Sequence, residues 1–421
     1  MLRSVAQLVR TEALLSTAWS RGLTILALVM AFAAGLALGR ITFGHSAGRA
    51  PELVADRVRV APAGPWGVLE YVPISIECPE GLLPLRAFES KQTHWLLKGY
   101  TPEKWLALLS QLGIDGELRD QLRAPEVFSI VDGGIEISPT TRIVLEFPPK
   151  ARKELYTLLA SFPENRSALT FILSKTVDER FAANEVSSQT VALLKRVSCE
   201  YGRYLVFSDI AGLCSMIPTY QERVRFVKAL TRQSSILARL RVTPGSNVDE
   251  LVNYWGRAST AKDVRPLLES LTKVPGGARL DLINLLPRAA AARLNTFPLP
   301  ENPLNGTFVR KDCHWTAFNF FRNLPDDRFV NHDVLISSLH DDYFPLMSDP
   351  RYGDLALFLT PDGQLVHSAV YLADNIVYTK NGDTSLHPWM LSTVEDLIDQ
   401  YSFQVPPDKA LEVKYYRSKN Y

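Results

Sequence analysis

The chain has 421 residues, of which 46% are apolar and 22% are charged, and its net charge is +1. This length predicts two or three domains, and the composition is that of a globular protein with ample material for a core. Because no block of lysine and arginine stands out, the sequence carries no electrostatic footprint for nucleic acid.

The N-terminal segment is unlike the rest of the chain. Residues 22–39 carry no charge and are bracketed by Arg21 and Arg40. A helix of this length spans roughly 27 Å, close to the roughly 30 Å hydrocarbon core of a bilayer. Arginines before it favour a cytoplasmic N-terminus, with the bulk of the chain on the periplasmic side. We interpret residues 1–43 as a cytoplasmic leader and a single-pass transmembrane anchor. A cleaved signal peptide is the alternative, because the sequence AFA at 31–33 fits a cleavage site.

Residues 44–66 are small, polar and proline-bearing, which predicts a stalk. Residues 67–150 predict a small mixed α/β region. Within it, "VLEYVPISIEC" reads as extended. "TPEKWLALLSQLG" reads as a helix with Thr101 as N-cap, Pro102 at the first helical position and Gly113 at its end. "PEVFSIVDGGIEISP" predicts two strands about a turn, and "TTRIVLEFPP" a third strand.

Residues 151–296 show apolar residues at steps of three and four, including "SSQTVALLKRVSCEY" and "YQERVRFVKALTRQSSILARL". This periodicity predicts a helical domain, followed by a proline-rich linker at 297–306. None of the four cysteines forms a C-x-x-C pair, so a zinc ribbon has no support. If the chain is exported, a disulfide between Cys199 and Cys214 is conceivable.

Residues 307–421 combine a helix with an antiparallel meander. "CHWTAFNFFRNL" reads as a helix, whereas "DLALFL", "LVHSAVYLA" and "IVYTKN" read as three strands joined by tight turns. A further helix, "WMLSTVEDLIDQY", is expected after His387-Pro388. The overall prediction is an α+β protein, with the meander packed against the first of these helices.

The meander can bring Cys313 and His367 together. A thiol has a free pKa of about 8.5 and is activated by a helix N-terminus and by a nearby histidine. Cys313 begins the predicted helix, and His367 opens the second strand. The imidazole also needs a polar group that fixes its tautomer. Thr379 and Asn381 point the same way from the third strand, so either can fill that role, whereas Lys380 points the other way.

This pattern resembles the NlpC-type cell-wall peptidases of the papain-like superfamily. In that family a cysteine at a helix start is followed by "GDL", seen here as 353–355, and by "H-x-x-x-Y-L", seen here from His367 to Leu372. The resemblance covers about 307–421. It implies a papain-like fold, cleavage of peptide amide bonds in peptidoglycan, and no cofactor. Cys313 then corresponds to the nucleophile and His367 to the general base and acid. The family's third residue falls near Thr379, and Asn381 is the alternative.

Other interpretations of these residues remain open. Cys313 can be a buried small hydrophobe, as free cysteines often are. Asp312 suits a helix cap as well as any catalytic role. His314 points about 100° away from Cys313 on a helix, which favours a structural or solvent-facing role. A zinc site from Cys313, His367 and the histidines at 332 and 340 lacks conventional spacing. Gly353-Asp354 is more typical of a capped turn than of a catalytic pair.

Two hypotheses of function follow. The first is a membrane-anchored, exported thiol protease or amidase that hydrolyses peptidoglycan peptides through Cys313 and His367. The second is a cell-envelope scaffold whose papain-like domain is catalytically degenerate and whose helical domain binds envelope proteins. A polar side chain within hydrogen-bonding reach of His367 favours the enzyme.

Overall fold

The structure is a computed structural model that describes residues 58–420, apart from 91–92, 161, 166–170, 175–176, 202–203, 208, 258–260, 300–310 and 406–408. The predicted anchor at 22–39 and most of the predicted stalk lie outside the described residues. Among the helices that are described, none combines the length and the apolar character needed to cross a bilayer. Residues from Arg59 onward group into one compact unit.

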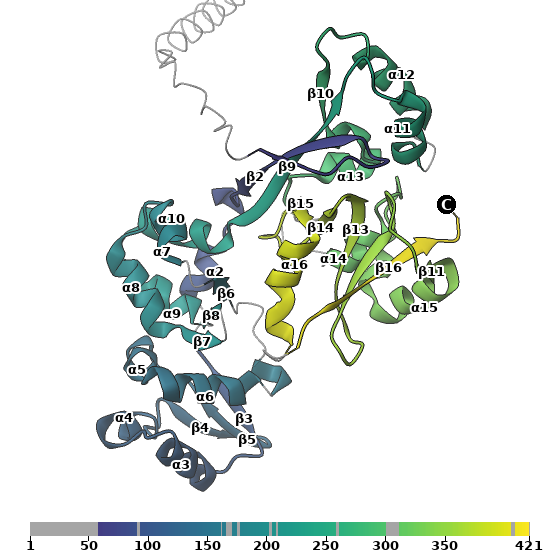
Figure 1. The fold of residues 1–421 in the computed structure, drawn as a ribbon. Coiled ribbons are helices and arrows are strands. Elements are labelled where there is room, and N and C mark those ends of the chain that lie inside the picture. Colours follow the sequence, from purple (N-terminus) through teal and green to yellow (C-terminus); the bar gives the residue numbers. More distant parts are fainter. Residues whose placement is uncertain are drawn as a thin grey trace, which may run out of the picture. The chain divides into compact units, whose positions relative to one another are not determined.

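The described chain is α+β, as predicted, and its strands form four antiparallel sheets (Figure 1). The first sheet has the order β1-β2-β9-β10, made of Arg59–Val60, Val68–Ile76, Gln233–Val242 and Ala278–Asp281. The extended segment predicted at 68–78 is therefore confirmed as β2. Because β1 pairs with β2 and Ala61 is buried, the end of the predicted stalk belongs to the folded unit.

Helices with one apolar face accompany this sheet. They are α11 (Val248–Trp255), α12 (Ala261–Leu271), the 3-10 turn η4 (Leu282–Leu285) and α13 (Arg288–Arg293). Their buried residues join the main apolar cluster, which also includes buried residues of β9.

The second sheet has the order β3-β5-β4, made of Trp95–Lys98, Gly134–Ile137 and Phe128–Val131. Helices α3 (Pro102–Gln111) and α4 (Gly116–Gln121) lie between β3 and β4 in the chain. The predicted cap of α3 is confirmed, since Thr101 accepts from Lys104 N–H and Pro102 is the first helical residue. The strand predicted in "TTRIVLEFPP" is wrong. Thr140 accepts from Ile143 N–H, which begins helix α5 (Thr141–Glu146), and β3 supplies the third strand.

The middle region contains helices and a third sheet, in the order β6-β8-β7. Its strands are Phe171–Ser174, Tyr204–Phe207 and Cys199–Tyr201. Its helices are α6 (Pro149–Ala160), α7 (Val177–Ala182), α8 (Ser188–Val197), α9 (Ile210–Met216) and α10 (Tyr220–Thr231). α2 (Leu85–Ser90) packs against α9 and α10, and short 3-10 turns lie at Glu80–Leu82 and Pro163–Asn165.

Two predictions for this region need correction. The helix predicted through Leu240 ends at Thr231, and β9 follows it. Every second residue of β9 from Ile236 to Val242 is buried, which is the period of two of a strand and not that of a helix. The conceivable disulfide does not form, because Cys199 and Cys214 are both free thiols.

The fourth sheet has six strands in the order β11-β16-β12-β13-β14-β15. They are Tyr343–Pro345, Glu412–Ser418, Leu355–Leu359, Leu365–Ala373, Ile376–Lys380 and Trp389–Thr393. The predicted meander is confirmed as β12, β13 and β14. The helix predicted from Trp389 begins only at Val394, because Trp389–Thr393 pairs with β14 and Thr393 caps α16 (Val394–Tyr401).

Helices cover both faces of this sheet. The short helix α14 (Cys313–Phe318) packs on β13 and β14. Its apolar residues share one cluster with Val370 and Leu372 of β13. On the opposite face, Ala369 and Tyr371 share a cluster with residues of α16. The 3-10 turn η5 (Asp327–Val330) and α15 (His332–Asp342) follow α14, and η6 (Ser402–Gln404) follows α16.

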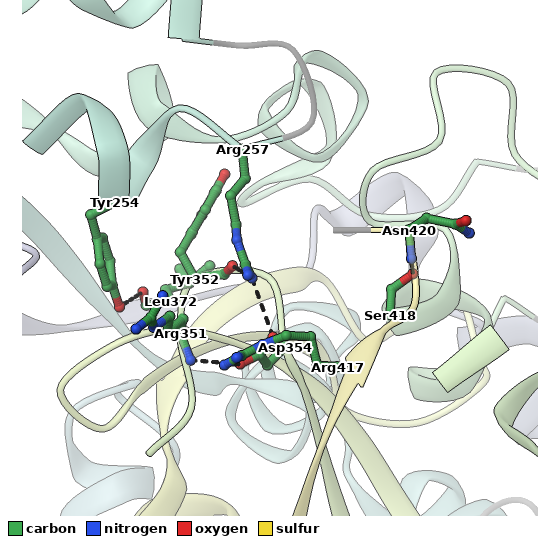
Figure 2. A network of polar contacts seen from close by, with 9 residues as sticks. All are labelled: Tyr254, Arg257, Arg351, Tyr352, Asp354, Leu372, Arg417, Ser418 and Asn420. Carbon is green, nitrogen blue, oxygen red and sulfur yellow. Dashed lines mark hydrogen bonds and ion pairs between the residues drawn. The ribbon is translucent and has the colours of Figure 1, made fainter. Parts of the chain in front are cut away.

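A buried carboxylate joins the start of β12 to two other parts of the chain (Figure 2). Asp354 is 1% exposed and accepts from Arg417 of β16, with Nη2 at 2.7 Å, and from Arg257 Nη1 at 3.2 Å. It also accepts from the backbone N–H of Arg351 at 2.6 Å, which closes the turn at Gly353, where φ is +89°. The predicted capped turn is therefore present, and it carries an ion-pair network as well.

Candidate functional site

Cys313 is the first residue of α14, as the sequence predicted. Asp312 is the N-cap, and its Oδ1 accepts from Trp315 N–H at 2.8 Å. The Cys313 side chain is only 7% exposed. The thiol therefore lies at the start of a helix, but it is shielded from solvent.

Burial raises the pKa of the Cys313 thiol to about 12, and the negative charge of Asp312 acts in the same direction. The backbone amides of Ser368 and His314, and the charge of Lys380, lower the pKa but do not outweigh burial. This direction is opposite to the activation expected from a helix N-terminus and a histidine. In this conformation the thiol is neutral at neutral pH.

His367 lies in β13 and is completely buried. Its Nε2 is 2.8 Å from Thr379 Oγ1 in β14. Its Nδ1 has no hydrogen-bond partner among the described residues. The ring stacks on Tyr401 of α16, with centroids 4.2 Å apart and planes 27° apart. Burial, and secondly the charge of His314, lower the pKa of His367 well below its ordinary value, so this imidazole is also neutral.

The structure separates the two alternatives for the residue that orients His367. Thr379 makes the contact. Asn381 turns to α16 instead, where its Nδ2 donates to Gln400 Oε1 at 2.8 Å. Asn381 therefore connects the end of β14 to the last turn of α16, and Thr379 fixes the imidazole.

Cys313 and His367 belong to opposite faces of the β13–β14 pair, and Nδ1 of His367 makes no hydrogen bond to the thiol. His367 extends from the face that α16 covers, whereas α14 covers the other face. The backbone amide of Ser368, which follows His367, faces the thiol and lowers its pKa. Tyr401, stacked on His367, has a pKa raised by burial and then by the charges of Cys313 and Asp312. Groups on both faces of the sheet thus interact electrostatically with Cys313.

His314 has a structural contact, in keeping with one of its predicted roles. Its Nδ1 is 2.8 Å from Ser368 Oγ, which ties α14 to β13. Burial lowers its pKa, and His332 acts in the same direction. No group of three or more His, Cys, Asp or Glu in the described part of the chain is arranged to hold a metal ion.

Two residues of the site were missed in the sequence. Lys380 is fully buried at the end of β14, on the face opposite Thr379, and Tyr401 covers His367. The signal for Lys380 was available, since it continues the alternation of inward-facing Ile376 and Tyr378. Tyr401 gave no signal, because its stacking depends on where α16 lies.

A cavity of about 330 Å³ lies near the other end of α14. Phe318, Phe321, Arg322 and Gly353 are among its lining residues, together with Ser418 of β16. Cys313 and His367 do not line this cavity, so it is separate from the thiol site.

Comparisons of the chain with protein-family models, with curated proteins and with solved structures found no match.

Proposed function

We propose that this protein is a thiol hydrolase that cleaves peptide amide bonds, with Cys313 as nucleophile and His367 as general base and acid. The observation that carries the proposal is the setting of His367. Its Nε2 is engaged by Thr379, while its buried Nδ1 has no hydrogen-bond partner among the described residues. A buried acceptor without a partner is costly, and such groups recur at sites that await a substrate or a proton.

This setting favours one tautomer. If Nε2–H donates to Thr379 Oγ1, the lone pair on Nδ1 is free to accept a proton. No hydrogen bond joins this nitrogen to the Cys313 thiol in the structure, so proton transfer requires the two groups to move together. The thiolate then attacks the amide carbonyl carbon, and the tetrahedral intermediate collapses to a thioester as the amine leaves with the proton from His367. Water, deprotonated by His367, hydrolyses the thioester and returns the thiol.

Access to the site requires movement of α16. Cys313 is 7% exposed and His367 is fully buried under Tyr401, so no substrate carbonyl reaches the sulfur in this conformation. The bond between Asn381 and Gln400 holds the last turn of α16 in place. Opening this turn hydrates both reacting groups, which lowers the thiol pKa and raises the imidazole pKa toward values suited to catalysis.

The substrate and location rest on the sequence. The resemblance of 307–421 to NlpC-type peptidases supports peptidoglycan peptides as the substrate, and the apolar segment at 22–39 supports a membrane anchor with a periplasmic site. If a reporter that works only in the cytoplasm is active when it is fused after Leu304, that result contradicts this location.

A second candidate is a catalytically degenerate envelope scaffold. The observation that favours it is that the thiol and the imidazole are both buried and neutral.

One experiment separates the two candidates. Full-length protein is incubated with peptidoglycan peptides, and the products are identified by mass spectrometry. The hydrolase predicts cleavage by the wild type and by Cys199→Ala, with no cleavage by Cys313→Ala and very little by Cys313→Ser. If the wild type cleaves nothing and Cys313→Ala retains the cellular phenotype, the scaffold replaces the hydrolase.

A further inference from the structure

A fully buried lysine lies on the face of the sheet that α14, the helix of the candidate nucleophile, covers. Lys380 is 0% exposed and ends β14. It shares a strand face with Tyr378, which packs in the apolar cluster of α14. Lys380 pairs with Trp389 in the neighbouring strand β15. The Trp389 side chain donates from Nε1 to Thr316 Oγ1 at 3.0 Å, and Thr316 lies about one helical turn after Cys313 in α14. The Lys380 side chain therefore lies on the α14 side of the sheet.

Neutral groups hold the ammonium. Nζ donates to the carbonyl oxygens of Gly382 at 2.6 Å and Thr384 at 3.1 Å. Across the described ranges, no carboxylate pairs with Lys380 at ion-pair distance. A buried charge without a charged partner is unfavourable for folding, and groups perturbed in this way concentrate at functional sites.

The charged and titratable neighbours of Lys380 come from two elements. Asp312 and Cys313 lie at the start of α14, and Asp383 and His387 lie in the loop after β14. Burial lowers the pKa of Lys380 to about 8, although Asp383, Cys313 and Asp312 each raise it. The group is therefore a cation below about pH 8 and loses its charge above it.

We propose that Lys380 is a positioning residue of the thiol site, whose buried ammonium stabilises the thiolate formed when Cys313 gives up its proton. The neutral imidazole of His367 provides no positive charge until it has taken that proton, whereas the ammonium is in place beforehand. The catalytic meaning of this role rests on the proposed function. The electrostatic effect itself, in which a cation favours the Cys313 thiolate, can be measured without a substrate.

The test measures alkylation by iodoacetamide at each cysteine of the full-length protein, against pH, by peptide mass spectrometry. In the wild type, the rate at Cys313 rises with pH and flattens around pH 8, where Lys380 loses its proton and the thiol pKa rises. Lys380→Met keeps an unbranched side chain but removes the charge. At pH 7 it slows alkylation of Cys313 on the order of tenfold or more, and the flattening disappears. Lys380→Arg restores the rate in part but not the flattening, because arginine keeps its proton throughout.

Cys199 is the matched control, since it is 8% exposed against 7% for Cys313. Its rate stays the same in all three proteins. If Lys380→Met loosens the fold, both thiols react faster, and the wild-type profiles of the two thiols then decide. Flattening near pH 8 at Cys313 but not at Cys199 supports the inference, whereas flattening at both thiols, as expected for ordinary thiol ionisation, or at neither overturns it. Equal Cys313 rates in wild type and a folded Lys380→Met also overturn it. Amide hydrolysis is measured separately. If Lys380 affects the pKa of the Cys313 thiol as expected but no amide is hydrolysed, the result counts against the proposed function alone.

Discussion

Nε2 of His367 and Oγ1 of Thr379 lie 2.8 Å apart on the neighbouring strands β13 and β14. Both side chains are completely buried, so the contact is shielded from water. A short, buried contact of this kind fixes the ring orientation, and the tautomer then follows from whether the hydroxyl donates or accepts. When Nε2–H donates to Thr379, the remaining nitrogen, Nδ1, is an acceptor.

The first prediction concerns this contact. Thr379→Ala leaves the nucleophile in place but frees the imidazole tautomer, so the rate of amide hydrolysis falls about 10²- to 10⁴-fold. Thr379→Ser retains the hydroxyl and most of the activity. Asn381→Ala changes the rate little, because Asn381 contacts Gln400 rather than His367. Steady-state kinetics of the three variants decide the matter, and a larger loss from Asn381→Ala than from Thr379→Ala contradicts the assignment.

The second prediction concerns stability in mild acid. Burial lowers the pKa of His314 and His367, and lowers that of His387 to about 3. The unfolded chain takes up these protons near pH 6.5, while the folded chain does so only at lower pH. Stability is therefore complete above about pH 6.5 and is lost as the pH falls toward the folded pKa values. Each histidine contributes up to about 1.4 kcal/mol per pH unit.

Urea unfolding between about pH 6.5 and 4.5 measures this loss before most carboxylates titrate. His387→Gln reduces the slope of unfolding free energy against pH. His340→Gln is the surface control, since that side chain is 89% exposed. If the wild-type free energy of unfolding stays constant over this range, the buried histidines take up protons in the folded state as readily as in the unfolded state, which contradicts the prediction.

The third prediction concerns Asp354. Asp354→Asn keeps the shape but removes the charge that pairs with Arg257 and Arg417, whose side chains are 18% and 16% exposed. Breaking a buried pair on one side costs about 3–5 kcal/mol. Asp178→Asn is the control, because that carboxylate is 66% exposed and its pair with Lys195 is worth about 1 kcal/mol or less. Similar urea midpoints for the two variants run against this expectation.

The fourth prediction concerns the loop that holds the Lys380 ammonium. Gly382 has φ +102°, and an added Cβ would lie 2.7 Å from Nδ1 of His387. Gly382→Ala therefore combines backbone strain of about 1–3 kcal/mol with a steric clash. Gly363→Ala is the matched control, since φ is +85° there but nothing lies within 4 Å of the added carbon. The difference between the two unfolding free energies isolates the clash, and no difference means that the loop adjusts freely.

Local signals in the sequence were sufficient for much of the C-terminal region. Turn residues and alternation located β12, β13 and β14, and Asp312 identified the start of α14. The same alternation showed that Thr379 and Lys380 face opposite sides of the sheet. It could not show which of Thr379 and Asn381 reaches His367, because that depends on the position of α16.

The errors arose where periodicity and propensity gave no clear preference. β9 directly follows a helix and contains leucine and arginine, which suit helices, so only its alternation marks it as a strand. "TTRIVLEF" is rich in β-branched residues but contains Thr140, whose cap begins a helix. The raised pKa of Cys313 was not predictable either, because burial by elements distant in sequence outweighs the local helix start.

The order of strands in the six-stranded sheet bears on how the protein emerges during synthesis. β16 comes after all its sheet partners in the chain, yet it lies between β11 and β12. A nascent chain that has not reached Glu412 has open edges on both of those strands, and Asp354 lacks Arg417. Open strand edges are sites of mispairing. This sheet can therefore be completed only after β16 has been synthesised. A chain that terminates before β16 exposes these strand edges, and quality-control machinery can recognise them.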